Sequence, residues 1–462
     1  MDKSQIYEEV IRIIPKADVS NDPVILYAYN GDVAEFAGLA DCVARPTTAQ
    51  QVESIVKLAA AHKIPLIPRG AGTGTSGATA PTSGGIIIDF TKMNKILKVD
   101  LVNRTVIVQP GVVQGQLNDQ LKKYGFYIPV IPGSSAMATV GGMVGNDASG
   151  RKTIRYGTTK DWVRNLEVVF PNGNRCHLSR PVLKSVAGYD LVRLLVGSEG
   201  TLAIITEVAL RIEPVPQFTR IVKAEYNSLE NAGKTIEEIY KSPITPSSVE
   251  ILDKSALYSL KSYASTLDLV TEAEAVLLIE LEGFSNQSLF EQAKVIAFCC
   301  RSAGAAEIEI SESDEDNARI WESRELIGAA VNAVREGYTR VYVGEDIVVP
   351  IQKIPTILLK LRELSAKYNL PIAVFGHIGD GNLHPAITIR KDKACDRENL
   401  ALLEEEIYQE VLSLDGSVTG EHGVGRARKN FLPEQLGKAL DIMTSIKKAV
   451  DPDNIMNPGV IF

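Results

Sequence analysis

The feature that most constrains this chain is a glycine-rich segment that follows a short apolar run. Residues 64–68 are typical of a β-strand, and residues 72–77 (GTGTSG) match the spacing GxGxxG. In a Rossmann fold a helix starts inside this motif, because the helix N-terminus holds the dinucleotide pyrophosphate. Residues 78–85 (ATAPTSGG) cannot sustain a helix. The sequence therefore argues against a Rossmann fold.

The same loop could still bind phosphate. Consecutive glycines allow backbone N–H groups to converge on an anion without interference from Cβ atoms. Thr73, Thr75 and Ser76 add hydroxyl donors, and Arg69 adds a positive charge nearby. A flexible surface loop accounts for this segment equally well, so the first motif alone does not decide between the two.

A second segment, residues 132–150, is long, rich in small residues and nearly uncharged. Such a segment can run close beside a flat, bulky ligand, although tight turn packing would also produce it. Two segments of this kind in one half of the chain indicate a large cofactor more strongly than either segment does alone.

Three of the five histidines stand in unusual settings. His377 and His384 lie seven residues apart across a glycine-containing turn, and Glu421 and His422 lie between glycines. Two histidines and one carboxylate form a common set of ligands for a divalent ion with open coordination positions. A single glycine-flanked histidine is more often a turn or core residue, but three of five weaken that interpretation. His62 and His177 are expected to be structural or exposed.

The bulk composition limits the class of protein. A chain of 462 residues suggests two or three domains, and a net charge of -8 argues against a nucleic-acid-binding face. The five cysteines form no CxxC pair, which argues against an iron–sulfur cluster or a cysteine-rich zinc site and fits a reducing compartment. Residues 1–15 resemble a short helix rather than a signal peptide, and no apolar run could span a membrane. We therefore expect a cytoplasmic protein without a transmembrane segment.

The pattern of the chain changes near residues 213–216. Before this point glycines and short strands dominate, and after it long helical patterns alternate with strands, as in an α+β domain with an antiparallel sheet. Helices are expected over residues 49–62, 113–124, 231–240, 291–303, 317–335, 351–367 and 397–412. Strands are expected over residues 163–170, 202–212, 275–282, 340–349, 372–376 and 383–389.

Several segments together resemble the vanillyl-alcohol-oxidase, or PCMH-type, FAD-binding fold. They are residues 68–74 (PRGAGTG), 132–150, 155–158 (RYGT), 188–191 (GYDL) and 195–202 (LVGSEGTL). Within this fold the chain is similar to the glycolate oxidase and D-lactate dehydrogenase group over nearly its whole length. The resemblance implies an α+β protein with a two-subdomain FAD-binding domain over residues 1–216. An α+β cap domain would follow over residues 217–415, and a C-terminal segment, residues 416–462, would return to the FAD-binding domain.

The resemblance also implies FAD, extended between two subdomains with the first glycine loop on its pyrophosphate. The expected FAD-binding residues are Arg69, Gly70, Gly72, Thr73, Gly74, Thr75, Pro132, Gly133, Ser134, Thr139, Gly142, Asn146, Ser149, Gly150, Tyr156, Glu199, Gly200, Ile204 and Asn457. Some relatives bind flavin covalently through histidine or cysteine. Neither glycine-rich segment contains either residue, so we expect non-covalent FAD.

The same resemblance assigns roles at the reacting centre. His377, His384 and Glu421 match the ligands of a divalent metal, which could be zinc, iron or manganese, and His422 matches the base. Arg324 matches the arginine that clamps the substrate carboxylate, since a guanidinium can bond both oxygens. The pattern alone would favour a solvated helical arginine paired with a nearby glutamate.

The implied activity is FAD-dependent oxidation of a small D-2-hydroxy acid. Relatives that act on 2-hydroxyglutarate carry a lysine where Gly344 stands here, which favours D-lactate or glycolate. A D-2-hydroxyglutarate-type dehydrogenase and a metal hydrolase that uses no flavin are the alternatives. An electron-transfer subunit without turnover would not need the histidine set, and an ether-lipid-type synthase would carry a histidine-rich run absent here.

A protein partner is expected to accept the electrons, because the chain has no cysteine cluster. An electron-transfer flavoprotein or an iron–sulfur subunit would both serve. A homodimer is compatible with the sequence.

Overall fold

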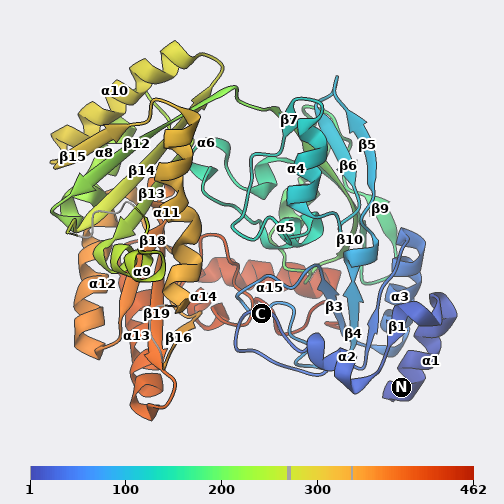
Figure 1. Ribbon diagram of the computed structural model, residues 1–462. Helices are drawn as coiled ribbons and strands as arrows, with labels where there is room; N and C mark the ends of the chain where they lie inside the picture. Colours follow the sequence, from blue (N-terminus) through green and yellow to red (C-terminus); the bar gives the residue numbers. More distant parts are fainter. Residues whose placement is uncertain (1, 268–271, 334–336) are drawn as a thin grey trace. The chain divides into compact units, whose positions relative to one another are not determined.

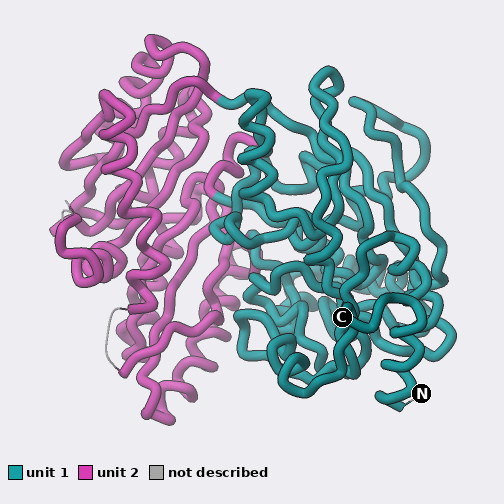
Figure 2. The backbone as a smooth tube through the Cα atoms, turned by 45° about the vertical axis from the view of Figure 1, so that its right-hand side comes forward, with its two compact units in different colours: residues 1–150, 157–215, 421–462 teal, residues 151–156, 216–420 magenta. Residues whose placement is uncertain are grey.

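The computed structural model describes residues 2–267, 272–333 and 337–462, and the chain divides into two compact units. Unit 1 contains residues 1–150, 157–215 and 421–462, and unit 2 contains residues 151–156 and 216–420 (Figure 2). The crossing at 215/216 lies one residue from the expected start of the cap domain. The short segment 151–156 belongs to unit 2, although unit 1 flanks it in the sequence.

Unit 1 contains two main sheets (Figure 1). The first has the order β1 (Val19–Ser20), β2 (Cys42–Ala44), β4 (Ile86–Asp89) and β3 (Leu66–Arg69). The second has the order β5 (Ile96–Asp100), β6 (Thr105–Val108), β10 (Ile204–Arg211), β8 (Val163–Val169) and β9 (Arg175–His177). β2, β4 and β3 run parallel, and the second sheet is antiparallel throughout. A two-stranded pair joins β7 (Phe126–Tyr127) to β11 (Glu213–Pro214).

The helices of unit 1 are short, and the first sheet packs against two of them. They are α1 (Lys3–Ile13), α2 (Pro23–Ala28), α3 (Ala49–His62), α4 (Gln114–Lys122), α5 (Val140–Asn146), α7 (Leu191–Leu195), α14 (Leu432–Leu436) and α15 (Lys438–Val450). In α3 the buried residues Val52, Ile55, Val56 and Ala59 recur at helical spacing. A capping box between Thr48 and Gln51 fixes where α3 begins. These residues share one apolar core with the inner face of the first sheet.

Unit 2 is built on one eight-stranded sheet. Its order is β15 (Glu307–Ile310), β12 (Phe218–Tyr226), β14 (Ala275–Gly283), β13 (Ser248–Asp253), β18 (Ile372–Gly376), β19 (Asn382–Arg390) and β16 (Tyr338–Val341), with β17 (Ile347–Val348) also paired to β19. Every pair is antiparallel. The helices are α6 (Thr153–Tyr156), α8 (Leu229–Lys241), α9 (Lys254–Tyr263), α10 (Asn286–Ser302), α11 (Asp314–Ala333), α12 (Ile354–Tyr368) and α13 (Ala394–Ser413).

One face of the unit 2 sheet carries the side chains that matter for the site. Residues directly opposite in antiparallel strands point to the same face, and Phe375 stands opposite both His384 and Leu252. An apolar cluster joins Leu252 and Phe375 to α9 and α11, including Trp321. We call this the α11 face of the sheet.

Most of the expected elements are confirmed, and the glycine-rich segment 132–150 contains α5, whose first turn is capped by Thr139. One expectation was wrong. Residues 340–349 are not one strand: β16 ends at Val341 and β17 begins at Ile347. Gly344, between them, has a φ of 61° and breaks the extended backbone. Within the described ranges, no helix is both long and apolar enough to cross a membrane.

Candidate functional site

The expected site residues are divided between the two units. Unit 1 holds Arg69, Gly70, Gly72, Thr73, Gly74, Thr75, Pro132, Gly133, Ser134, Thr139, Gly142, Asn146, Ser149, Gly150, Glu199, Gly200, Ile204, Glu421, His422 and Asn457. Unit 2 holds Tyr156, Arg324, His377 and His384. Each unit is described in turn.

The first glycine loop leaves β3 without entering a helix, as the sequence predicted. Arg69 holds it in shape: its Nη1 donates to the Gly31 carbonyl at 2.6 Å and to Thr79 Oγ1 at 3.0 Å. Gly72 has a φ of 70°, and a Cβ there would lie 2.2 Å from Arg69 Nη2. Within the described part of the chain, the N–H groups of residues 72–74 donate to no protein acceptor. Such a set of donors suits the pyrophosphate of FAD.

The two glycine-rich segments meet at the start of α5. A Cβ on Gly70 would lie 2.1 Å from Thr139 Oγ1, so only glycine allows this approach. Thr139 Oγ1 in turn accepts the N–H of Gly142 at 3.3 Å. Upstream, Pro132 accepts the N–H of Ser135 in a turn, and a Cβ on Gly150 would overlap the Ile131 carbonyl. The first glycine loop and the N-terminus of α5 therefore lie side by side and form one surface that consists mainly of backbone atoms.

Glu199 and Asn457 connect this surface to the C-terminal segment. The Glu199 carboxylate accepts the N–H groups of Val424 and Gly425, both at 2.8 Å. Burial raises the pKa of Glu199 to about 7, against the opposing effect of these two donors. Asn457 Nδ2 donates to the carbonyls of Glu199 at 2.7 Å and Ala78 at 3.0 Å. Its Oδ1 is buried without a partner among the described residues and could accept a cofactor hydroxyl or amino group.

Two other expected FAD residues have different surroundings. A Cβ on Gly200 would lie 2.3 Å from Pro68 Cγ, so this glycine allows close packing on β3. Ile204 is fully buried in the core beneath the first sheet. Only its backbone could reach a cofactor.

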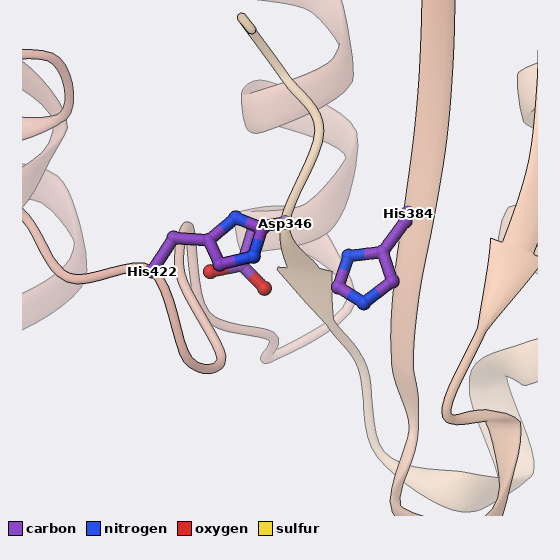
Figure 3. A group of neighbouring side chains, drawn as sticks. All are labelled: Asp346, His384 and His422. Atoms are coloured by element: carbon purple, nitrogen blue, oxygen red, sulfur yellow. The ribbon is translucent and has the colours of Figure 1, made fainter. Parts of the chain in front are cut away.

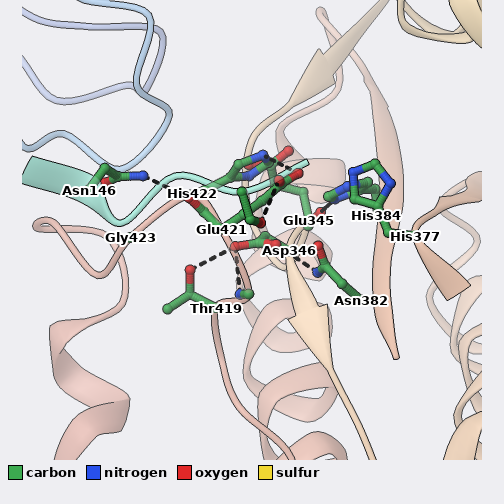
Figure 4. Close-up of polar contacts among 12 residues, drawn as sticks. Asn146, Glu345, Asp346, His377, Asn382, His384, Thr419, Glu421, His422 and Gly423 are labelled. Carbon is green, nitrogen blue, oxygen red and sulfur yellow. Dashed lines mark hydrogen bonds and ion pairs between the residues drawn. The ribbon is translucent and has the colours of Figure 1, made fainter. Parts of the chain in front are cut away.

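Asn146 and Ser149 hold the first residue of the C-terminal segment. Asn146 Nδ2 donates to the Glu421 carbonyl at 2.7 Å (Figure 4). Ser149 Oγ donates to Glu421 Oε2 at 3.1 Å. Glu421 Oε1 lies 3.7 Å from His422 Nε2. Gly423 must be glycine, because a Cβ there would lie 2.3 Å from Asn146 Oδ1. Residues expected to line FAD thus also fix the expected metal ligand Glu421.

In unit 2 the tight turn between β18 and β19 brings His377 and His384 together, as their spacing predicted. Their ring centroids lie 5.2 Å apart and the ring planes are almost perpendicular, at 86°. Gly376 permits this approach: its φ is 132°, and a Cβ there would lie 2.8 Å from His384 Cδ2. Both imidazoles are buried.

Hydrogen bonds set the tautomer of each imidazole. His377 Nδ1 lies 2.6 Å from Glu250 Oε1, and His384 Nδ1 lies 3.1 Å from the Glu345 carbonyl oxygen. A carboxylate and a carbonyl can only accept, so each Nδ1 carries the proton and each Nε2 carries the lone pair of the neutral ring. Metal-binding histidines are commonly oriented in this way. The donor set of unit 2 therefore fits a divalent metal.

Glu250 links His377 to the expected carboxylate clamp. Arg324, on α11, donates from Nε to Glu250 Oε2 at 2.5 Å, and the Glu250 side chain is completely buried. Burial alone would raise the pKa of Glu250, but Arg324 and His377 outweigh it and lower the pKa to about 2. Glu250 was not predicted from the sequence, because its partners Arg324 and His377 lie 74 and 127 residues later in the chain.

Asp346 anchors the end of unit 2. Its carboxylate accepts from Asn382 Nδ2 at 2.9 Å, Thr419 Oγ1 at 2.7 Å and the Gly420 N–H at 2.9 Å (Figure 4). Asp346 and His384 have ligand atoms within 4.8 Å of one another (Figure 3). Because Gly420 is bonded covalently to Glu421, the chain leaves unit 2 directly beside Asp346. Asp346 was likewise not predicted as a site residue from the sequence.

The segment 151–156 is fastened to unit 2 by basic side chains. Lys152 pairs with Glu280 at 3.2 Å and with Glu282, and Arg155 Nη1 donates to the Glu282 carbonyl at 2.8 Å. The Arg151 guanidinium lies 4.8 Å from the Trp321 ring centroid. Tyr156, expected at the FAD, closes this segment in α6.

Comparisons with known proteins agree with these features. Residues 215–461 match the family model "FAD linked oxidases, C-terminal domain", and residues 40–179 match "FAD binding domain". The chain is 34% identical to "Glycolate oxidase subunit GlcD" of Bacillus subtilis, over 96% of this chain and 93% of the relative. It is 34% identical to "D-lactate dehydrogenase" of Anaerostipes hadrus, over 90% and 88%. It is 29% identical to "D-2-hydroxyglutarate dehydrogenase" of Stutzerimonas stutzeri, over 99% and 98%.

The solved structure of p-cresol methylhydroxylase with substrate bound matches with a TM-score of 0.80, at 18% identity, over 99% of this chain and 96% of that chain. This likeness establishes the fold, and the sequence matches establish the cofactor and the class of chemistry. The chain belongs to the family of FAD-linked oxidases, has the PCMH-type FAD-binding fold, and is an FAD-dependent oxidoreductase.

Proposed function

We propose that the chain oxidises a D-2-hydroxy acid to the corresponding 2-oxo acid. The observation that carries this proposal is the double role of Glu250, which orients His377 through one oxygen and Arg324 through the other. One buried carboxylate thereby contacts both an imidazole expected to bind the metal and a guanidinium expected to bind the substrate carboxylate. A 2-hydroxy acid presents the matching pair of groups, a hydroxyl beside a carboxylate.

Each group would have a separate role in this oxidation. FAD supplies the hydride acceptor when bound, and a divalent cation supplies a Lewis acid that lowers the pKa of a hydroxyl. His377, His384 and Glu421 would hold the cation. The Arg324 guanidinium would bond the substrate carboxylate and fix the orientation of the C2–H bond. His422 would accept the hydroxyl proton on an imidazole nitrogen.

The names of the relatives support this class of substrate. Glycolate, D-lactate and D-2-hydroxyglutarate, which those names print, all carry a hydroxyl beside a carboxylate. The reduced flavin must then be reoxidised. We propose a protein acceptor, an electron-transfer flavoprotein or an iron–sulfur subunit, because no cysteine cluster occurs in the sequence.

The proposal is tested by anaerobic mixing of the FAD-loaded protein with a panel of D- and L-2-hydroxy acids while the flavin absorbance is followed. We expect D enantiomers to bleach the flavin, and prior treatment with a chelator to slow the bleaching at least about 100-fold, which added Zn²⁺, Fe²⁺ or Mn²⁺ reverses. Bleaching by L enantiomers alone, or by none of the acids, would refute the proposal. Full activity after complete metal removal would refute the metal's role.

A further inference from the structure

Arg340, on β16, is a largely buried cation to which the proposed reaction gives no role. Resting on the proposed function, we infer that Arg340 binds a second carboxylate of the substrate while Arg324 binds the first. The preferred substrates are then four- or five-carbon D-2-hydroxy dicarboxylates rather than D-lactate or glycolate.

The strand register directs Arg340 toward the histidine pair. Arg340 stands opposite Thr388 on β19, and Thr388 and His384 are an even number of residues apart on that strand. Side chains at even spacing share one face of a sheet. Arg340, His384 and Phe375 therefore all project from the α11 face. Arg324 reaches the same place from α11 itself.

Phe375 lies close to both guanidinium groups. The Cζ atoms of Arg324 and Arg340 lie 5.6 Å and 5.7 Å from its ring centroid. The same ring centroid is 5.7 Å from that of His384. Two cations and one of the expected metal-ligating imidazoles thus surround a single aromatic ring, at separations that a small diacid could span.

The two arginines differ in their counterions. Arg324 bonds Glu250 at 2.5 Å, whereas Arg340 Nη2 lies 3.4 Å from Glu345 Oε2, a long contact. The Arg340 side chain is only 10% exposed, and its Nε has no hydrogen-bond partner among the described residues. Leaving a buried guanidinium donor unsatisfied is costly. A ligand carboxylate would satisfy it and would also reduce the repulsion between the two arginines.

The sequence favoured a monocarboxylate substrate, because Gly344 stands where relatives that act on 2-hydroxyglutarate carry a lysine. The surroundings of Gly344 do not contradict a dicarboxylate substrate. A Cβ on Gly344 would meet Ile387 and Ile407. Ile387 alternates with His384 along β19 and therefore faces away from the α11 face. The side-chain direction at position 344 thus lies on the opposite side of the sheet from the proposed anion site.

The test compares the FAD- and metal-loaded wild type with R340Q and R340K. We would measure kcat/KM for anaerobic flavin reduction by D-malate, D-2-hydroxyglutarate and D-lactate. Wild type should prefer one of the diacids over D-lactate by at least about 10-fold. R340Q should lower the diacid to D-lactate ratio about 10- to 100-fold, chiefly through KM, and R340K should restore part of it.

Arg220 supplies a matched control in unit 2. Its guanidinium also lies over an aromatic ring, at 5.3 Å from Phe290, and its Nε also lacks a partner among the described residues. R220Q should leave the diacid to D-lactate ratio unchanged. Two results would refute the role of Arg340 and leave the proposed function standing. In the first, D-lactate reduces the wild-type flavin with a higher kcat/KM than either diacid. In the second, R340Q lowers kcat/KM equally for all three acids. If no 2-hydroxy acid reduces the flavin, the proposed function itself fails.

Discussion

At the scale of single residues, Glu250 connects two of the expected site residues of unit 2. It is completely buried and ionised, and its two oxygens are divided between His377 and Arg324. Removing one partner of a buried ion pair leaves an uncompensated charge, so the three residues depend on one another. A change at Glu250 should therefore alter both the imidazole and the guanidinium.

We expect E250Q to weaken metal binding about 10- to 100-fold, because a neutral amide is a poorer partner for the His377 N–H than a carboxylate. Metal content after equilibrium dialysis measures this effect. E225Q is the matched control, since Glu225 is also buried and paired, with Lys223 at 2.8 Å, on a different strand of the same sheet. Equal metal loss in both variants would mean that the effect is a general loss of stability.

Glu199 should make the stability of unit 1 depend on pH. Its folded pKa is raised from 4.5 to about 7 by burial, so the folded chain binds more protons than the unfolded chain between these values. The contribution of Glu199 to stability is then greatest below about pH 4.5 and is lost as the pH rises through 7, by up to about 3 kcal/mol.

E199Q cannot ionise at this position and should lose that contribution. On going from pH 5 to pH 7.5, the urea midpoint of the apoprotein should change in the destabilising direction by more in wild type than in E199Q. The comparison cancels the titration of every other group. An identical pH dependence in the two proteins would contradict the raised pKa of Glu199.

At the scale of elements, the N-terminus of α5 joins the two glycine-rich segments. Thr139 caps α5, and its Oγ1 lies so close to Gly70 in the first loop that a Cβ on Gly70 would be 2.1 Å away from it. The capping interaction therefore fixes both the helix and the loop that we expect to hold the FAD pyrophosphate. Loss of the cap should alter cofactor affinity as well as stability.

T139A should destabilise the protein by about 1 kcal/mol and weaken FAD binding about 10-fold, and T139S should restore both. FAD affinity can be measured by quenching of flavin fluorescence. Thr48 caps α3 in the same way, in a part of unit 1 without expected cofactor residues. T48A should therefore cost similar stability with little change in FAD affinity. If T139A and T48A weaken FAD binding equally, α5 has no special place in the cofactor site.

Elements with local signals could be predicted from the sequence, and those defined by distant partners could not. α3 was predicted to the residue, because its apolar spacing and its threonine cap lie within the helix itself. The strand β13 (SVEILD) was missed, because polar and apolar residues alternate only over residues 248–251 and all six positions are buried by elements that are distant in the sequence. With β13 missed, Glu250 could not be assigned.

The histidine pair and the missed acids illustrate the same difference at the site. His377 and His384 are joined by one short turn, so their spacing revealed their proximity. Asp346 binds Thr419 and Gly420, more than 70 residues later in the chain. No local pattern records such a contact. The family resemblance supplied the residues with expected roles, but not the residues that hold them in place.

At the scale of the whole molecule, the expected site residues are divided between the two units. His377, His384 and Arg324 belong to unit 2, and Glu421 and His422 begin the last segment of unit 1. Asp346 binds the final two residues of unit 2 before this crossing, and Asn146 and Ser149 bind the first residue after it. The chain is therefore held by side-chain hydrogen bonds on each side of the crossing, within unit 2 before it and within unit 1 after it.

The most direct test of this account is a double-mutant cycle on the rate of anaerobic flavin reduction by the preferred D-2-hydroxy acid. It compares wild type, H384N from unit 2, H422N from unit 1, and the double variant. We expect each single variant to be slower by at least about 1,000-fold and the double variant to be no slower than the slower single, because groups that act as one unit are not additive. A double variant whose loss equals the product of the two single losses, or a single variant with the wild-type rate, would contradict a shared site.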